Sequence, residues 1–66
     1  MDREQILNMD SYILLSLINM KLRDEFPNIK DFCSEFNISE EDLNNKLRAI
    51  RYIYNEKNNQ YVSIEA

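Results

Sequence analysis

Residues 32–47 read FCSEFNISEEDLNNKL, and this stretch decides the fold that the sequence predicts. The apolar side chains spaced to hold two crossed helices together are Phe32, Ile38, Leu43 and Leu47. Asn37 tolerates the left-handed backbone conformation, so it can end the first helix at a tight corner without a glycine. Ser39 can then cap the second helix, because its hydroxyl accepts from N–H groups that lack a helical partner. Two short helices, one on each side of Asn37, are therefore expected.

This stretch also resembles the helix-turn-helix pattern shared by many bacterial regulators. In that pattern a large apolar residue is followed by a small one, and then by a turn residue and another apolar residue. Cys33 would be the small residue, at the place where the helices approach most closely. A capping Ser or Thr and two apolar residues four apart complete it, and Ser39, Leu43 and Leu47 match those positions. The resemblance implies a fold rather than a function, since one fold can carry many functions.

Upstream of the corner the sequence predicts one longer helix. Residues 11–25 carry apolar side chains at helical spacing, and Pro27 ends this helix because it disfavours helical backbone at the residue before it. Asn28 can cap the next helix, over residues 29–36, whose apolar residues fall on one face.

Downstream of the corner the spacing changes from helical to strand-like. Residues 52–54 and 60–64 are rich in strand formers, and residues 55–59 have the composition of a turn. A hairpin directly after the second helix of such a unit looks like the wing of a winged helix. The expected fold class is mainly α with a small β-hairpin (α+β), in which a three-helix helix-turn-helix core is followed by a C-terminal two-stranded wing.

The length of 66 residues fits one domain, and residues 1–9 are expected to be a loosely ordered N-terminal arm. A domain this small is marginally stable, and one Cys with no His excludes an internal disulfide and a Cys/His zinc site. Association with another chain is the remaining way to gain stability, so a homodimer is expected. The apolar arc of residues 11–25 is wider than the ~100° that a surface helix needs. The residues expected at the dimer contact are Ile13, Leu17 and Met20.

Composition also argues against several classes of protein. The charged start lacks the features of a signal peptide, and no run reaches the roughly 20 apolar residues of a membrane span, so a cytoplasmic location is expected. With no His, no Gly and no metal-binding cluster, neither catalysis nor a cofactor nor a small-molecule substrate is expected.

Two functions follow from this fold, and both use the helix after the corner. The first is a DNA-binding regulator in which the start of that helix enters the major groove, where Asn can read adenine and Arg guanine. The second is an acidic adaptor that uses the same fold to bind a basic protein partner, and the net charge of −4 opposes non-specific attraction to phosphate backbones. The residues expected to contact DNA or a partner are Ser39, Glu40, Glu41, Asn44, Asn45, Arg48, Arg51 and Lys57.

Three features have a simpler structural explanation beside a functional one. Glu40, Glu41 and Asp42 suit the positive end of a helix dipole, and Asp42 falls at the third position of a capping box. Cys33 could be reactive, but its place on an apolar face favours core packing. The hairpin tyrosines could stack on single-stranded nucleic acid, although cross-strand packing also explains them.

A closer resemblance covers nearly the whole chain. The matching segments are Tyr12-Ile13-Leu14-Leu15-Ser16, Asn19-Met20-Lys21-Leu22-Arg23-Asp24, Tyr52-Ile53-Tyr54-Asn55 and Asn59-Gln60-Tyr61. They resemble a family of short bacterial proteins known only as a domain of unknown function, number forty-two-fifty. The resemblance implies no activity, because none is attached to the family.

Overall fold

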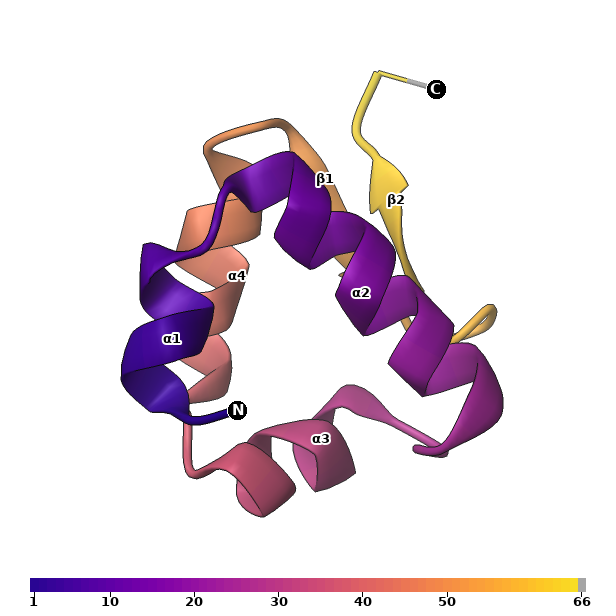
Figure 1. The fold of residues 1–66 in the computed structure, drawn as a ribbon. Helices are drawn as coiled ribbons and strands as arrows, with labels where there is room; N and C mark the ends of the chain where they lie inside the picture. The colour runs from indigo at the N-terminus through magenta and orange to yellow at the C-terminus, as the bar shows by residue number, and fades with distance from the viewer. Residues whose placement is uncertain (66) are drawn as a thin grey trace.

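A computed structural model describes residues 1–65, in which four helices precede a two-stranded antiparallel sheet. The elements are α1 (Arg3–Asn8), α2 (Ser11–Asp24), α3 (Ile29–Phe36), α4 (Glu40–Arg48), β1 (Tyr52–Asn55) and β2 (Gln60–Ser63). In Figure 1, α1 lies against α4, and α2 runs along the hairpin. The expectation of a mainly helical fold with a C-terminal hairpin is confirmed.

The corner between α3 and α4 has the local structure that the sequence predicts. Asn37 has a φ of 53° and a ψ of 46°, which is the left-handed conformation, and its N–H donates to the Cys33 carbonyl. The Ser39 hydroxyl accepts from the Asp42 N–H at 3.0 Å and so caps α4. Because Asn37 turns the chain and Ser39 restarts the helical pattern, residues 32–47 form two helices and not one.

The N-terminus differs from expectation, because residues 3–8 form helix α1 where a loosely ordered arm was expected. Asp2 accepts from the Gln5 N–H at 2.9 Å, and the Gln5 side chain accepts from the Asp2 N–H at 3.0 Å, which is a reciprocal capping box. Ile6 is 0% exposed and ties the helix to the core. The fold therefore has four helices, and the three expected helices are α2, α3 and α4.

One cluster of buried side chains draws on every helix and on β2. Its members are Ile6, Leu14, Ile18, Leu22, Ile29, Phe32, Cys33, Ile38, Leu43, Leu47 and Tyr61. Phe26 and Phe36 extend it, and the ring centroids of Phe26 and Phe32 lie 5.5 Å apart and nearly perpendicular. Cys33 is only 5% exposed, so its packing in the core is confirmed. Burial raises the pKa of its thiol to about 11, with a smaller contribution from Glu40.

The hairpin pairs β1 with β2 in a single register. Tyr52 lies opposite Ser63, Ile53 opposite Val62, Tyr54 opposite Tyr61, and Asn55 opposite Gln60, with residues 56–59 as the turn. Just beyond the strands the Ile64 N–H donates to the Arg51 carbonyl at 2.9 Å, which extends the same pairing. The rings of Tyr54 and Tyr61 lie 5.5 Å apart across the strands.

Candidate binding surface

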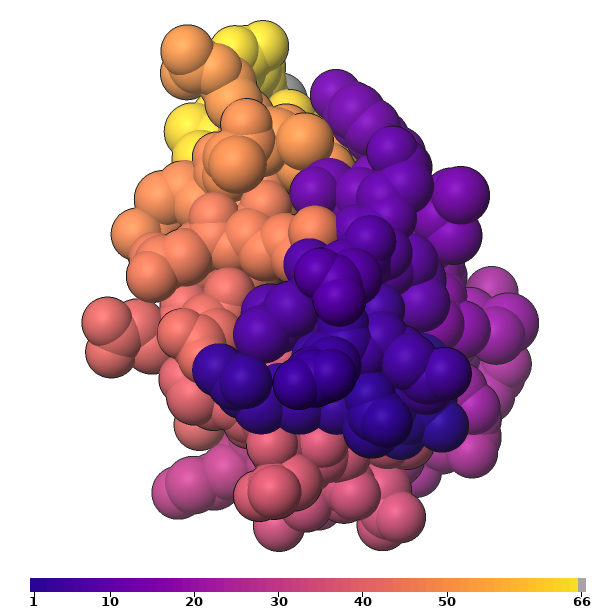
Figure 2. All heavy atoms as spheres, turned by 60° about the vertical axis from the view of Figure 1, so that its left-hand side comes forward, coloured from indigo at the N-terminus to yellow at the C-terminus, as the bar shows by residue number. Residues whose placement is uncertain are grey.

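Helix α4 has one buried side and one open side. Leu43 and Leu47 are fully buried against the core. At about 100° per residue, the side chains opposite them belong to Glu41, Asn45 and Arg48, and all three are exposed. On one flank α1 lies against the helix, as Figure 2 shows with the indigo segment beside the salmon one. The open side of α4 therefore presents one acid, one amide and one guanidinium.

The first turn of α4 is acidic. Ser39, Glu40 and Glu41 are exposed there. The Asp42 carboxylate pairs with the Arg3 guanidinium on α1 at 3.1 Å. The expected capping box has two hydrogen bonds, and only the one that the Ser39 hydroxyl accepts is formed. The Asp42 side chain is turned toward Arg3 and so does not make the other. The two glutamates have no cation within 4 Å among residues 1–65, and their position at the start of α4 also suits the helix dipole.

Asn44 differs from the outward placement that the sequence predicts. Its side chain is half-buried, and its Oδ1 accepts from the Tyr61 hydroxyl at 2.6 Å. The residue faces the hairpin because it lies one helical turn beyond Glu40, on the flank that packs against β1 and β2. Its amide oxygen is thus committed to the fold.

The cations of the candidate surface differ in their pairing. Arg51 pairs with Glu65 at 3.3 Å, and both side chains are largely exposed. Arg48 and Lys57 are exposed and have no acidic partner within 4 Å among residues 1–65. A hollow beside β1 is lined by Asn44, Arg48, Ile53, Tyr54 and Glu56, so Arg48 borders the hairpin as well as the open side of α4.

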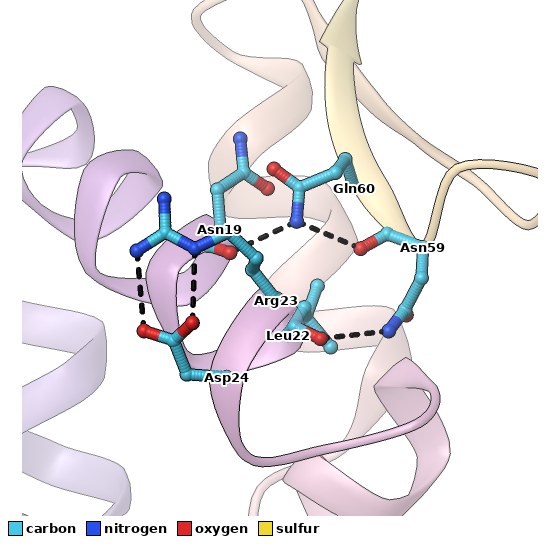
Figure 3. Close-up of polar contacts among 6 residues, drawn as sticks. All are labelled: Asn19, Leu22, Arg23, Asp24, Asn59 and Gln60. Atoms are coloured by element: carbon cyan, nitrogen blue, oxygen red, sulfur yellow. Dashed lines mark hydrogen bonds and ion pairs between the residues drawn. The ribbon is translucent and has the colours of Figure 1, made fainter.

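A set of polar side chains fixes the hairpin to the helices, and we call it the clasp: Asn19, Tyr54, Asn59, Gln60 and Tyr61. The Asn19 amide bonds both backbone groups of Tyr61, at 2.8 and 3.1 Å. Figure 3 shows Gln60 reaching the Asn19 carbonyl and Asn59 reaching the Leu22 carbonyl, each at 2.9 Å. Asn59 also donates to the Phe26 carbonyl at 2.9 Å and accepts from the Tyr54 hydroxyl at 2.6 Å.

From the sequence, the clasp residues were predicted only to lie in a helix (Asn19), a turn (Asn59) and two strands (Tyr54, Gln60 and Tyr61). Their long-range bonds have no local signature, although the unusual number of Asn residues near position 59 was a signal that could have been followed. Tyr61 is 2% exposed, so its ring offers no free face for stacking on a base. Burial raises the pKa of its hydroxyl well above its usual value.

Comparison with protein families gives one match. The model of a domain of unknown function, DUF4250, matches residues 8–61. The chain belongs to the DUF4250 family. All four segments that resemble the family lie within the matched range, and they include every clasp residue. No curated protein and no solved structure matches the chain. The matched range, residues 8–61, therefore contains both partners of every clasp contact.

The expected dimer residues lie on α2. Ile13 is 62% exposed and Met20 is 43% exposed, whereas Leu17 is half-buried. No helix within the described residues is long and apolar enough to cross a membrane. The same residues bring together no group of three or more His, Cys, Asp or Glu side chains that could hold a metal ion.

Proposed function

We propose that this DUF4250 chain is a non-catalytic module that binds a protein partner through the open side of α4. The observation that carries the proposal is the acidic first turn of the helix. Glu40 and Glu41 are exposed and have no cation within 4 Å among residues 1–65, while the neighbouring Asp42 is neutralised by Arg3. Unpaired charges on an open surface favour a partner of opposite charge.

The rest of the surface fits a polar protein better than it fits a polyanion. Arg48 is two turns further along the helix, and Asn45 lies between it and the glutamates. Affinity for DNA comes mainly from neutralised phosphates, and two acids at the start of the helix oppose that. A protein partner can match acids with bases and Arg48 with an acid of its own, and the net charge of −4 then assists its encounter with a basic surface.

Affinity capture with a matched pair of variants tests this function. The full chain is immobilised and exposed to nuclease-treated extract of its own source cell. We expect one stoichiometric protein that is retained by Glu35→Gln, an exposed acid on α3, and lost with Glu40→Gln/Glu41→Gln. Capture that the double variant leaves unchanged contradicts the proposal, and so does capture that disappears with nuclease treatment.

A second candidate is a winged helix-turn-helix protein that binds DNA as a homodimer. The observation that favours it is the corner at Asn37 and Ser39, followed by α4 and then directly by the hairpin. Arg48 and Lys57, which lack acidic partners among residues 1–65, would then contact phosphates or bases.

A gel-shift assay on random duplex DNA separates the two candidates. Binding at ~50 mM salt that weakens steeply with added salt, and that Arg48→Ala/Lys57→Ala reduces, supports the DNA-binding candidate. No shift at that salt concentration, where phosphate contacts are strongest, removes it.

A further inference from the structure

The two edges of the sheet are treated differently by the fold. Along the outer edge of β2, the Tyr61 N–H donates to Asn19 Oδ1 at 2.8 Å, and the Tyr61 carbonyl accepts from Asn19 Nδ2 at 3.1 Å. A side-chain amide thus occupies the place that a third strand would take. The outer edge of β1 has no such cover among the described residues.

The register shows which backbone groups point out of the open edge. Tyr61 directs its N–H and carbonyl away from β1, so its register partner Tyr54 directs its own away from β2. The alternation along a strand gives Tyr52 the same orientation. The Arg51 carbonyl accepts from the Ile64 N–H, so it points toward the β2 side of the hairpin. Tyr52 is the next residue, and its backbone groups therefore point the opposite way, as the alternation requires. Two N–H groups and two carbonyls therefore line the outer side of β1 without a recorded protein partner in residues 1–65.

The open edge is also accessible and partly apolar. A hollow runs beside it, between β1 and α4, and is lined by Ile53, Tyr54 and Arg48 among others. The Ile53 side chain, midway between the two outward-pointing tyrosine backbones, is 41% exposed. An exposed edge with an apolar residue at its centre is a template for pairing with another strand.

We propose that a second copy of this chain pairs its own β1 antiparallel to this edge. With the two-fold axis at Ile53, Tyr52 of each copy lies opposite Tyr54 of the other. Each of these two pairs exchanges two hydrogen bonds, so four outward N–H groups meet four carbonyls. Ile53 meets Ile53 of the second copy as a non-hydrogen-bonded pair, in which side chains on one face come close.

Charge at the strand ends fits this occupant. Arg51, whose guanidinium also pairs with Glu65 at 3.3 Å, precedes β1, and Glu56 and then Lys57 follow it. An antiparallel pair of β1 strands brings Arg51 of each copy near Glu56 of the other, whereas a parallel pair would place Arg51 near Arg51 and Glu56 near Glu56. The two-fold axis is perpendicular to the sheet, so both α4 helices lie on the same face of a four-stranded sheet.

The exposed residues of α2 are the competing dimer surface. Ile13 and Met20 are accessible, but a side-chain patch of this kind fixes neither the direction nor the register of a partner. The β1 edge fixes both, because its donors and acceptors alternate at set positions.

Two aspartate variants at exposed isoleucines test the assignment. Sedimentation analysis of the full chain from micromolar to millimolar concentration is expected to show a monomer–dimer equilibrium. Ile53→Asp places like charges on the axis and should weaken dimerisation at least about tenfold. Ile13→Asp, on α2, should leave it unchanged. A monomer at every concentration contradicts the proposal, and so does a dimer that Ile13→Asp abolishes or that Ile53→Asp leaves intact.

Amide exchange provides a second readout that does not depend on a substitution. As the concentration of the intact chain rises, the Tyr52 and Tyr54 N–H groups should become protected, because only pairing with a second strand gives them acceptors. Exchange at these two amides that stays fast in a sample shown to be dimeric would overturn the register.

Discussion

Asn19 on α2 makes both of its side-chain hydrogen bonds to one residue of the hairpin, Tyr61. The amide oxygen accepts from the Tyr61 N–H at 2.8 Å, and the amide nitrogen donates to the Tyr61 carbonyl at 3.1 Å. A two-stranded hairpin alone is marginally stable in water, so this anchor on α2 is part of what maintains the sheet. The Gln60 amide adds a bond to the Asn19 carbonyl at 2.9 Å, which fixes the same point from the other side.

Replacing Asn19 by Ala should therefore destabilise the domain. The change leaves two partly buried backbone groups of Tyr61 without partners, at a cost of about 1–3 kcal/mol. Urea denaturation followed by circular dichroism measures the change. Asn45→Ala, at an exposed position of α4, is the control and should stay within about 0.5 kcal/mol of the parent. If the Asn19→Ala chain were as stable as the Asn45→Ala chain, water would be replacing the hydrogen bonds of the Asn19 amide with no loss in the free energy of unfolding.

Two asparagines with the same backbone conformation should respond in opposite ways to glycine. Asn37 has a φ of 53° and Asn59 a φ of 52°. Asn37 is exposed and makes no recorded side-chain hydrogen bond within residues 1–65, so Asn37→Gly should relieve left-handed strain and stabilise by ~0.5 kcal/mol. Asn59→Gly removes bonds to the Leu22 and Phe26 carbonyls and to Tyr54, and should cost about 2–4 kcal/mol.

Thermal unfolding of the two glycine variants side by side provides the measurement. Since both gain the same backbone freedom, the difference between them isolates the side-chain bonds of Asn59. Equal melting temperatures would mean that the clasp bonds of Asn59 contribute nothing, contrary to the role assigned to them.

The corner and the hairpin could be predicted because their signals are local. Asn37 and Ser39 act on backbone groups within three or four residues of themselves, so their chemistry is visible in a short window of sequence. The bounds of α3 agree with the expected residues 29–36 for the same reason. The left-handed conformation of Arg51, at a φ of 66°, has no such signal, because Arg has no preference for this conformation.

The binding surface was harder to predict because side-chain direction depends on distant partners. Asn44 was expected to face outward with Asn45, but a hydroxyl 17 positions away holds it against the hairpin. Asp42 was expected to close a capping box, and Arg3 instead draws its carboxylate toward α1. Neither Tyr61 nor Arg3 is near its partner in the sequence, so spacing alone gives no warning.

Alkaline pH should destabilise the folded chain through Cys33. Burial raises the pKa of its thiol to about 11, so the folded state keeps a proton that the unfolded state releases. The contribution to the free energy of unfolding is complete below about pH 9 and is lost as the pH rises through about 11. The raised pKa of Tyr61 acts in the same direction.

Denaturation of the parent and of Cys33→Ala across this pH range separates the thiol from the other groups. The parent should lose stability more steeply than the variant between about pH 9 and 11, because only the parent has a thiol to ionise. Identical slopes would mean that the thiol is not protected from ionisation by the fold.

The N-terminal helix should be part of the stable domain, although Ile6 is its one buried residue and the DUF4250 match begins at residue 8. Ile6 is 0% exposed in the core cluster, and Ile6→Ala removes its contacts and leaves a cavity. The expected cost is about 2–4 kcal/mol, a large fraction of the stability of a domain this small. Leu7→Ala, on the same helix but only partly buried, is the matched control and should cost less. If Ile6→Ala unfolds at the same urea concentration as the parent, α1 is not packed on the core in solution.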